Sequence, residues 1–322
     1  MSKPANEGIV TRQYLGHYFV QTEDRLVDCA LSSRLRKQLQ YPEAAPGSRR
    51  QRVQSVRRVR VIDPVAIGDR VIFDPGGDNN TGMIREVCAR RNKISRRASG
   101  GSRKEQLIAA NIDQVVPIFS AAEPKPGWHL LDRMLAIAEW QNIPPAICFN
   151  KQDLTDETRA HQTMQPYEAI GYPVVYTSII SNTGKEAFRD LLTGRVTLFM
   201  GPSGVGKSSL LNWLQPGLQL RTGQISEASG EGKHTTSHTE LVALDGGGLV
   251  GDIPGVREFY LFGITPEDIP ELFREFRPHI TECRFRDCTH IHEPDCAVKT
   301  ALDAGKITPQ RYQSYLRLRE KP

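Results

Sequence analysis

The sequence has no hydrophobic run long enough to cross a membrane, and its first ten residues contain no apolar stretch of signal-peptide length. These absences predict a cytoplasmic protein with no membrane partner. Cysteine is scarce as well, with 6 residues in a chain of 322. Three are scattered, which argues against a disulfide-stabilised fold, whereas Cys283, Cys288 and Cys296 lie close together and indicate one local metal site.

Acidic residues are scarce in the first third of the chain. Residues 1–107 contain 21 Lys and Arg but 11 Asp and Glu, whereas the whole chain has a net charge of +5. Between Arg34 and Arg60, nine basic residues accompany a single acid, Glu43. Such a cluster forms either a solvated face or a polyanion-binding surface. Its one-sidedness favours a polyanion, because binding phosphates releases counterions.

Short runs rich in Val, Ile, Tyr and Phe predict that this third is a β-domain. Strands are expected at residues 16–22, 25–33, 57–63, 69–75 and 82–91, separated by Gly- and Asp-rich turns. Five short strands in a basic unit predict a partly open barrel of the oligonucleotide-binding (OB) type, and another small barrel would give the same pattern. Residues from about Gln40 to Val56 lack this periodicity and are interpreted as a mobile basic insertion.

From about Asn111, strands alternate with helices. Apolar strands are expected at residues 112–121, 144–150, 172–178 and 195–200, and helices at 129–140, 185–192 and 207–214. Near-continuous apolar strands separated by helices predict an α/β domain with a mostly parallel sheet covered on both faces. We therefore expect three domains: a basic, OB-like RNA-binding domain at 1–107, the α/β domain at 108–264, and a largely helical domain at 265–322.

The strand at 195–200 leads into a phosphate-binding loop. This loop contains G-x-x-x-x-G-K-S between a strand and a helix, as the motif requires. Glycines let backbone N–H groups turn towards phosphates, and the helix N-terminus adds positive potential. Lys207 is expected to bridge the β- and γ-phosphates, and Ser208 to ligate Mg²⁺. The residues expected to bind phosphate are Gly201, Pro202, Ser203, Gly204, Val205, Gly206, Lys207, Ser208 and Ser209.

The strand at 144–150 ends in Asn150, Lys151, Gln152 and Asp153, which fits the guanine-reading pattern N-K-x-D. Asp153 is expected to accept hydrogen bonds from the N1–H and 2-amino groups of guanine. Adenine offers no such donors, so a carboxylate facing it is left unpaired at a cost of about 1–3 kcal/mol or more. Lys151 is expected to lie along the base, and Asn150 to hold the neighbouring loops together. The pattern therefore predicts binding of GTP rather than ATP.

Two further elements complete the set of a GTPase. Asp252 begins D-x-x-G, in which it reaches Mg²⁺ through water while Gly255 donates to the γ-phosphate. Upstream, a Gly- and Ser-rich stretch contains Thr235 and Thr236, either of which completes the Mg²⁺ shell. The base reader therefore comes first, whereas in the usual order the phosphate loop does. This order predicts a circularly permuted P-loop GTPase domain, because the termini of α/β domains often lie close together.

The permuted order, with a basic barrel before it and a Cys/His cluster after it, closely resembles the ribosome small-subunit-dependent GTPase A family (RsgA, also called YjeQ). The resemblance covers nearly the whole chain and includes GPSGVGKSSLLN, GKHTT, DIPGVREF and CRFRDCTHIHEPDCAV. It implies a bacterial GTPase that binds the small ribosomal subunit and its rRNA late in the maturation of the subunit. The subunit is expected to stimulate the hydrolysis of bound GTP to GDP. We expect the protein to act as a monomer.

This sequence departs from the family in three places. One is the basic insertion near residues 40–56, and a second is Ile253, where the family usually has Thr. The third is Ile179 after Ser178, where a small residue usually lets a backbone N–H meet the guanine carbonyl. Ser178 is counted among the guanine-binding residues through this resemblance.

The C-terminal cluster reads Cys283-x4-Cys288-x-His290-x5-Cys296. Three thiolates and one imidazole, with no carboxylate, suit a closed tetrahedral structural Zn²⁺ site, and one zinc per chain is expected. His292 competes for the fourth position, and the family pattern favours His290. The tail at 308–321 is interpreted as an amphipathic basic helix that either docks on RNA or closes the domain.

The residue that orients the hydrolytic water is a separate question. Val256 stands just after D-x-x-G, where many GTPases have Gln, so slow intrinsic turnover is expected. His234 is a candidate for this role, and a solvated loop histidine is the competing interpretation. Gly204 replaces the Asn of potassium-dependent relatives, so no specific K⁺ requirement is expected. Two alternatives stay open: a GTP-dependent RNA-binding scaffold or chaperone with little turnover, and a GTPase acting on another RNA.

Overall fold

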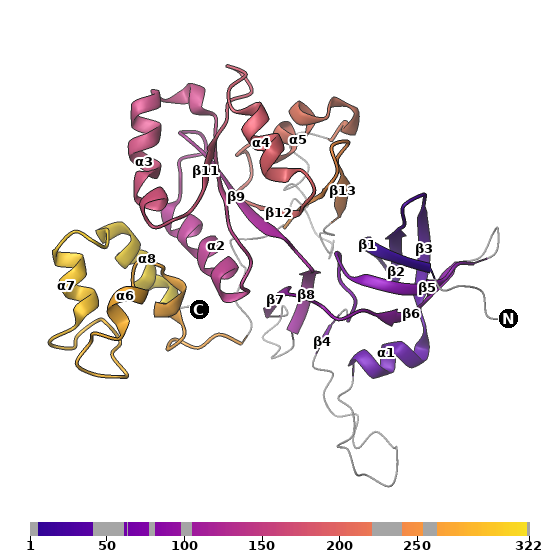
Figure 1. The fold of residues 1–322 in the computed structure, drawn as a ribbon, viewed down its shortest axis with the longest axis horizontal. Helices are drawn as coiled ribbons and strands as arrows, with labels where there is room; N and C mark the ends of the chain where they lie inside the picture. Colours follow the sequence, from indigo (N-terminus) through magenta and orange to yellow (C-terminus); the bar gives the residue numbers. More distant parts are fainter. Residues whose placement is uncertain are drawn as a thin grey trace, which may run out of the picture.

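The computed structural model describes residues 6–40, 61–62, 64–76, 81–97, 105–220, 240–253 and 263–320 of the chain. Three units follow one another: a small β-barrel, an α/β sheet with helices, and a helical C-terminal unit (Figure 1). The expected basic insertion lies, beyond Gln40, outside the described residues. Among the helices of the described segments, none is long and apolar enough to span a membrane.

Five strands close the first unit into a barrel in the order β1-β2-β3-β6-β5. Their bounds are β1 Asn6–Tyr14, β2 His17–Gln21, β3 Leu26–Leu31, β5 Arg70–Asp74 and β6 Gly82–Val87. Alternate residues such as Val10, Val20, Phe73 and Ile84 are fully buried inside it. The OB-like barrel is thus confirmed, and it is closed rather than partly open. Helix α1 (Ser33–Gln40) follows β3.

A second, three-stranded sheet lies between the barrel and the α/β sheet. Its order is β4-β8-β7, with bounds β4 Val61–Ile62, β7 Lys93–Arg97 and β8 Glu105–Ala110. Strand β8 leads within four residues into the central strand β9 (Gln114–Ser120) of the α/β sheet. Buried hydrogen bonds secure this passage, since Asn111 donates to the Gly68 carbonyl at 3.0 Å. The three-stranded sheet is therefore joined to the α/β sheet by a short connection.

The α/β sheet has six strands in the order β11-β10-β9-β12-β14-β13, parallel except for β13. The remaining strands are β10 Ile147–Asn150, β11 Val174–Tyr176, β12 Val196–Met200, β13 Leu241–Ala243 and β14 Leu249–Asp252. The helices are α2 Trp128–Trp140, η1 Gln152–Leu154, α3 Glu157–Ala169, α4 Lys185–Leu192, α5 Lys207–Leu214 and η2 Pro216–Leu218. This confirms the expected permuted, mostly parallel sheet.

Both faces of the sheet are covered because its central strand is apolar on both sides. Every residue of β9 is buried, with Val115 and Phe119 in one hydrophobic cluster and Val116 and Ile118 in another. Helices α2 and α3 contribute to the first cluster, and α4 and α5 to the second. Figure 1 shows these two helix pairs on opposite sides of the sheet.

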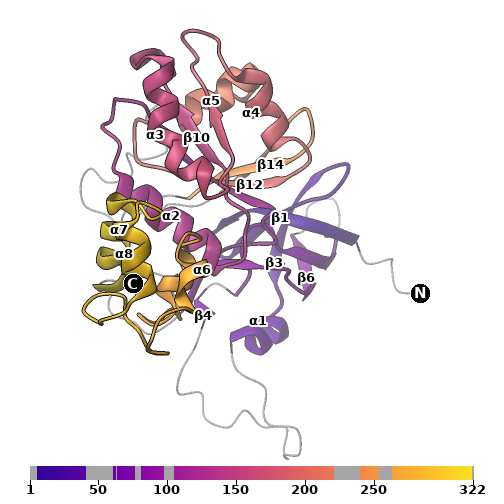
Figure 2. The ribbon, with the colours of Figure 1, turned by 60° about the vertical axis from the view of Figure 1, so that its left-hand side comes forward.

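The C-terminal unit consists of η4 Ile269–Leu272, α6 Arg277–Ile280, α7 Ala297–Asp303 and α8 Pro309–Glu320. Figures 1 and 2 both show α8 lying against α2. Phe273, Phe276 and Tyr315 join the hydrophobic cluster that also contains α2. The C-terminal unit therefore shares its core with the α/β domain.

A buried ion-pair network reinforces this contact. The side chain of Arg311 on α8 is only 3% exposed and lies 2.8 Å from Asp132 of α2 and 2.6 Å from Glu275. The Tyr167 hydroxyl of α3 donates to the same Asp132 carboxylate at 2.9 Å. The tail helix was expected either to dock on RNA or to close the domain. Arg311 contributes to the second role, because it holds α8 against α2.

Replacing Arg311 with alanine should lower the free energy of unfolding by about 3–5 kcal/mol, because Asp132 and Glu275 would stay buried without a counter-charge. Urea unfolding measures this loss. Arg317→Ala is the matched control, since Arg317 is exposed on the same helix and its loss should cost at most about 0.5 kcal/mol. Adding Asp132→Asn and Glu275→Gln to Arg311→Met should recover part of the stability. Equal effects of Arg311→Ala and Arg317→Ala would contradict the argument.

Candidate nucleotide site and metal centre

The sequence motifs for nucleotide binding meet at one edge of the sheet. Strands β10, β12 and β14 end at Asn150, Met200 and Asp252, and β9 lies between β10 and β12. The carboxyl ends of parallel strands point to the same edge, where α/β proteins bind their ligands. The base reader, the phosphate loop and the D-x-x-G aspartate therefore converge although they are far apart in the chain.

The phosphate loop requires glycine at particular positions. Gly204 and Gly206 have φ angles of +81° and +101°, which side-chain-bearing residues rarely adopt. A Cβ atom on Gly206 would lie 2.5 Å from the Asn150 amide nitrogen. Helix α5 begins at the next residue, Lys207, so its N-terminus faces the loop. The backbone is arranged as a phosphate cradle needs to be.

Lys207 and Asp252 form a partly desolvated pair at the centre of this edge. The Lys207 Nζ atom donates to the Gly201 carbonyl at 2.7 Å and lies 3.7 Å from Asp252 Oδ2. Burial raises the pKa of Asp252 to about 6 despite the nearby ammonium group, and burial lowers the pKa of Lys207. Asp252 Oδ1 is buried and has no hydrogen-bond partner among the described residues. A free acceptor oxygen on Asp252, which lies near Lys207, the residue before Ser208, fits an Mg²⁺ ion and its water shell.

Asn150 connects three loops at this site. Its amide group donates to the Val205 carbonyl of the phosphate loop at 2.8 Å and accepts from the Thr177 hydroxyl at 2.9 Å. Both Asn150 and Thr177 are almost fully buried. Thr177 was not predictable from the sequence, because a threonine at the end of a strand carries no motif of its own.

The expected base-reading residues lie beside one another. Asp153 accepts a hydrogen bond from the Ser178 hydroxyl at 2.5 Å, which brings together two loops that are 25 residues apart. Lys151 has a left-handed backbone with φ of 59°, and its Nζ atom donates to the Glu123 carbonyl at 2.6 Å. Gln152 donates through its backbone to the Thr177 carbonyl. A carboxylate beside a hydroxyl at the mouth of the sheet suits the donor edge of guanine.

Several expected residues lie outside the described part of the chain. These are His234, Thr235, Thr236 and Gly255, together with Val256. Ile253 is described: it is 2% exposed, belongs to the cluster that includes α2, and donates its N–H to the Phe199 carbonyl at 3.0 Å. An apolar side chain therefore suits position 253, where the RsgA family usually has threonine.

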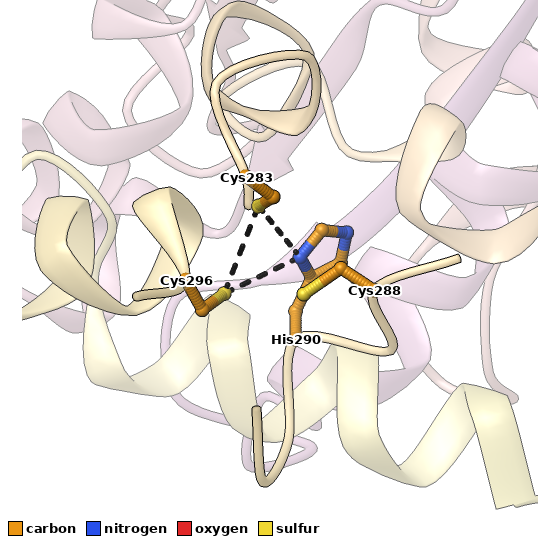
Figure 3. A group of neighbouring side chains, drawn as sticks. All are labelled: Cys283, Cys288, His290 and Cys296. Carbon is orange, nitrogen blue, oxygen red and sulfur yellow. Dashed lines mark hydrogen bonds between the residues drawn. The ribbon is translucent and has the colours of Figure 1, made fainter. Parts of the chain in front are cut away.

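The C-terminal Cys/His cluster is drawn in Figure 3. One ligand atom from each of Cys283, Cys288, His290 and Cys296 lies within 4.8 Å of all the others. The sulfur atoms of Cys283 and Cys296 are 3.9 Å apart, and they lie 3.5 and 3.4 Å from His290 Nδ1. A tetrahedral zinc with ordinary bond lengths requires about 3.8 Å between sulfurs and about 3.5 Å between sulfur and nitrogen. The spacing of the ligand atoms fits zinc.

The cluster contains His290 and not His292. His290 is 1% exposed, whereas His292 is exposed. Burial, together with the neighbouring thiols, raises the pKa of Cys288 to about 12, so a cation is needed to hold Cys288 as a thiolate. Burial also lowers the pKa of His290, which favours the neutral imidazole that metals bind.

Side chains outside the cluster hold the histidine loop in place. The hydroxyls of Tyr312 and Tyr315 on α8 donate to the carbonyls of His290 and Thr289 at 2.6 and 2.5 Å. Glu293 accepts from the backbone N–H groups of Thr289, Ile291 and His292. Although burial opposes it, these hydrogen bonds hold the pKa of Glu293 well below its usual value. Glu293 is a supporting residue that the ligand pattern alone does not reveal.

Known proteins resemble this chain over most of its length. The family model described as RsgA GTPase matches residues 87–262. The small ribosomal subunit biogenesis GTPase RsgA of Gemmatimonas aurantiaca is 43% identical over 80% of this chain and 84% of its own. That of Geobacillus thermodenitrificans is 39% identical over 96% of this chain and 95% of its own.

Two solved structures share the fold. The crystal structure of YjeQ from Thermotoga maritima superposes with a TM-score of 0.74 and 29% identity, covering 98% of both chains. YloQ, described as a circularly permuted GTPase, gives a TM-score of 0.68 and 28% identity, covering 98% of this chain and 94% of its own.

Proposed function

The chain belongs to the RsgA GTPase family, and from that premise we propose that it hydrolyses GTP to GDP and phosphate on the small ribosomal subunit, late in its maturation. The observation that carries this proposal is the meeting of phosphate loop, base reader and Asp252 at one edge of a permuted sheet. The subunit stimulates a slow intrinsic reaction. The division into domains at 1–107, 108–264 and 265–322 is part of the same proposal.

Nucleotide binding is divided among the converging loops. The backbone of the phosphate loop and Lys207 hold the phosphates, while Asp153, with Ser178 beside it, reads the guanine edge. Ser208 and Asp252, together with Thr235 or Thr236, would hold Mg²⁺, which would supply positive charge to the transferred phosphoryl group. Because Asp252 Oδ1 lacks a partner among the described residues, it is available to a water molecule of the ion.

The barrel side binds RNA, and the C-terminal unit binds zinc. On the described part of the barrel side, α1 exposes Arg34, Arg36 and Lys37, which suit contacts with rRNA phosphates. The Cys283, Cys288, His290 and Cys296 cluster holds one structural zinc per chain, which fixes the loop packed against α8. We place this activity in the cytoplasm, carried out by a monomer.

Turnover of GTP with and without purified small subunits tests the proposal, with large subunits as the control particle. We expect at least about tenfold stimulation by small subunits alone, and none for Lys207→Ala, which loses its contact with the β- and γ-phosphates. Stimulation by large subunits instead would indicate another RNA substrate. Nucleotide-dependent binding without stimulation would indicate a scaffold with little turnover.

A further inference from the structure

The barrel touches the α/β sheet at the edge next to the magnesium site. Strand β1 of the barrel and the edge strand β13 lie side by side (Figure 1). At this contact Arg12 and Glu240 form an antiparallel backbone bridge. Glu240 immediately precedes β13, and in sequence it follows the stretch that contains Thr235 and Thr236. The barrel therefore meets the sheet where the nucleotide-binding elements are concentrated.

A β-bulge directs Arg12 towards this contact. Val10 pairs with Val20 and Arg12 with Phe19, so Thr11 is the extra residue of β1. Bulges re-aim side chains and recur near functional sites. The Arg12 guanidinium lies 3.9 Å from the centre of the Phe19 ring and 3.6 Å from the Glu240 carboxylate. Its Nε atom is buried without a hydrogen-bond partner in the described part of the chain.

The contact extends directly to Asp252. Leu241 pairs with Gly251 across β13 and β14. A Cβ atom on Gly251 would lie 3.0 Å from the Glu240 carbonyl oxygen, so the two backbones are closely packed at this point. Asp252 is the next residue, and its carboxylate lies 3.7 Å from Lys207. We therefore expect a displacement of Glu240 to move the backbone that carries Asp252.

The outer side of the contact is open to a partner. A shallow pocket of about 290 Å³ is lined by Arg12, Gln13, Tyr14 and Phe19, all on the β1–β2 hairpin of the barrel. The tip of this hairpin exposes Leu15, which is 79% accessible. A partner that binds the tip of this hairpin would therefore contact residues that are two or three positions from Arg12 in the sequence.

We propose that Arg12 is a positioning residue for GTP hydrolysis, which transmits contact between RNA and the barrel hairpin through Glu240 to the magnesium-binding end of β14. This inference rests on the proposed function, because it explains how the small subunit stimulates turnover. The Arg12–Glu240 pair is partly exposed, with side-chain accessibilities of 39% and 52%, so it adds little to folding stability. Its loss should affect stimulation and leave the fold intact.

The experiment compares Arg12→Gln, Glu240→Gln and the charge-swapped double variant Arg12→Glu/Glu240→Arg. GTP turnover is measured alone and with saturating small subunits, and thermal unfolding checks the fold. We expect each single variant to lower the stimulation at least about fivefold and to keep intrinsic turnover within about twofold of wild type. The double variant should restore most of the stimulation. Arg70→Gln, which removes the same charge from an exposed barrel pair with Glu7, should leave stimulation unchanged.

Glu240→Gln is the decisive variant, because removing an acid cannot weaken RNA binding electrostatically. Stimulation within twofold of wild type in this variant would overturn the inference. So would a double variant no better than the single ones, since Arg12 would then act by touching RNA itself. Wild-type protein that small subunits do not stimulate would overturn the proposed function and this inference with it.

Discussion

Cys288→Ala should bind no zinc, whereas the wild-type protein should hold one zinc per chain. Only two thiolates and His290 would remain, and a structural site of this kind contributes about 10–16 kcal/mol of binding energy that is coupled to folding. Metal analysis of the purified proteins measures the difference. Cys88→Ala is the matched control, because Cys88 lies outside the cluster and should leave the zinc content unchanged.

The loss of zinc should also lower the unfolding midpoint of the whole protein. The C-terminal unit shares one hydrophobic cluster with α2, so its disorder removes Phe273, Phe276 and Tyr315 from the core of the α/β domain. Thermal unfolding with and without a chelator checks this in the wild-type protein. Stoichiometric zinc in Cys288→Ala would show that another residue completes the ligand set.

Asp153→Asn should exchange GTP for xanthosine triphosphate as the preferred nucleotide. The carboxylate accepts from two guanine donors, and hydrogen bonds to a charged group contribute about 1.5–3 kcal/mol each, so GTP affinity should fall at least about 100-fold. The amide NH₂ of asparagine can donate to the 2-oxo group of xanthine, which offers an acceptor where guanine has a donor. Competition binding with GTP, ATP and XTP measures the change.

Asp190→Asn on α4 provides the control for this exchange. Asp190 is exposed and outside the site, so the variant should keep the wild-type order of nucleotides. An Asp153→Asn protein that still prefers GTP would show that another group reads the base.

The long apolar strands of the sheet were predictable because burial on both faces leaves a strong pattern. Helices α4 and α5 have the same bounds in the structure as in the sequence prediction. Strand β1 is not evident from sequence, since Ile9 and Val10 are its only aliphatic side chains among mostly polar residues. Helix α3 escapes prediction because Pro166 lies within it. Tertiary contacts, which the sequence pattern does not encode, decide such elements.

Site residues, like strands and helices, were predictable where the sequence carries a strong pattern. Motif residues such as Lys207 and Asp252 are recognisable because their chemistry requires fixed spacings, and the structure brings them together. Thr177 and Glu293 support the site through ordinary hydrogen bonds to neighbouring loops and have no such spacing. The family pattern favoured His290 over His292, and the burial of His290, which only the fold determines, agrees with that choice.

The ion pair between Asp132 and Arg311 has a consequence for synthesis of the chain. The two residues are 179 positions apart. At elongation rates of about 5–20 residues per second, Asp132 leaves the ribosome about 10–35 s before its partner. During that interval a carboxylate on the core-facing side of α2 has no counter-charge, which disfavours tight packing around it. The newly made GTPase domain should therefore stay loosely packed, and able to bind chaperones, until its last helix has been translated.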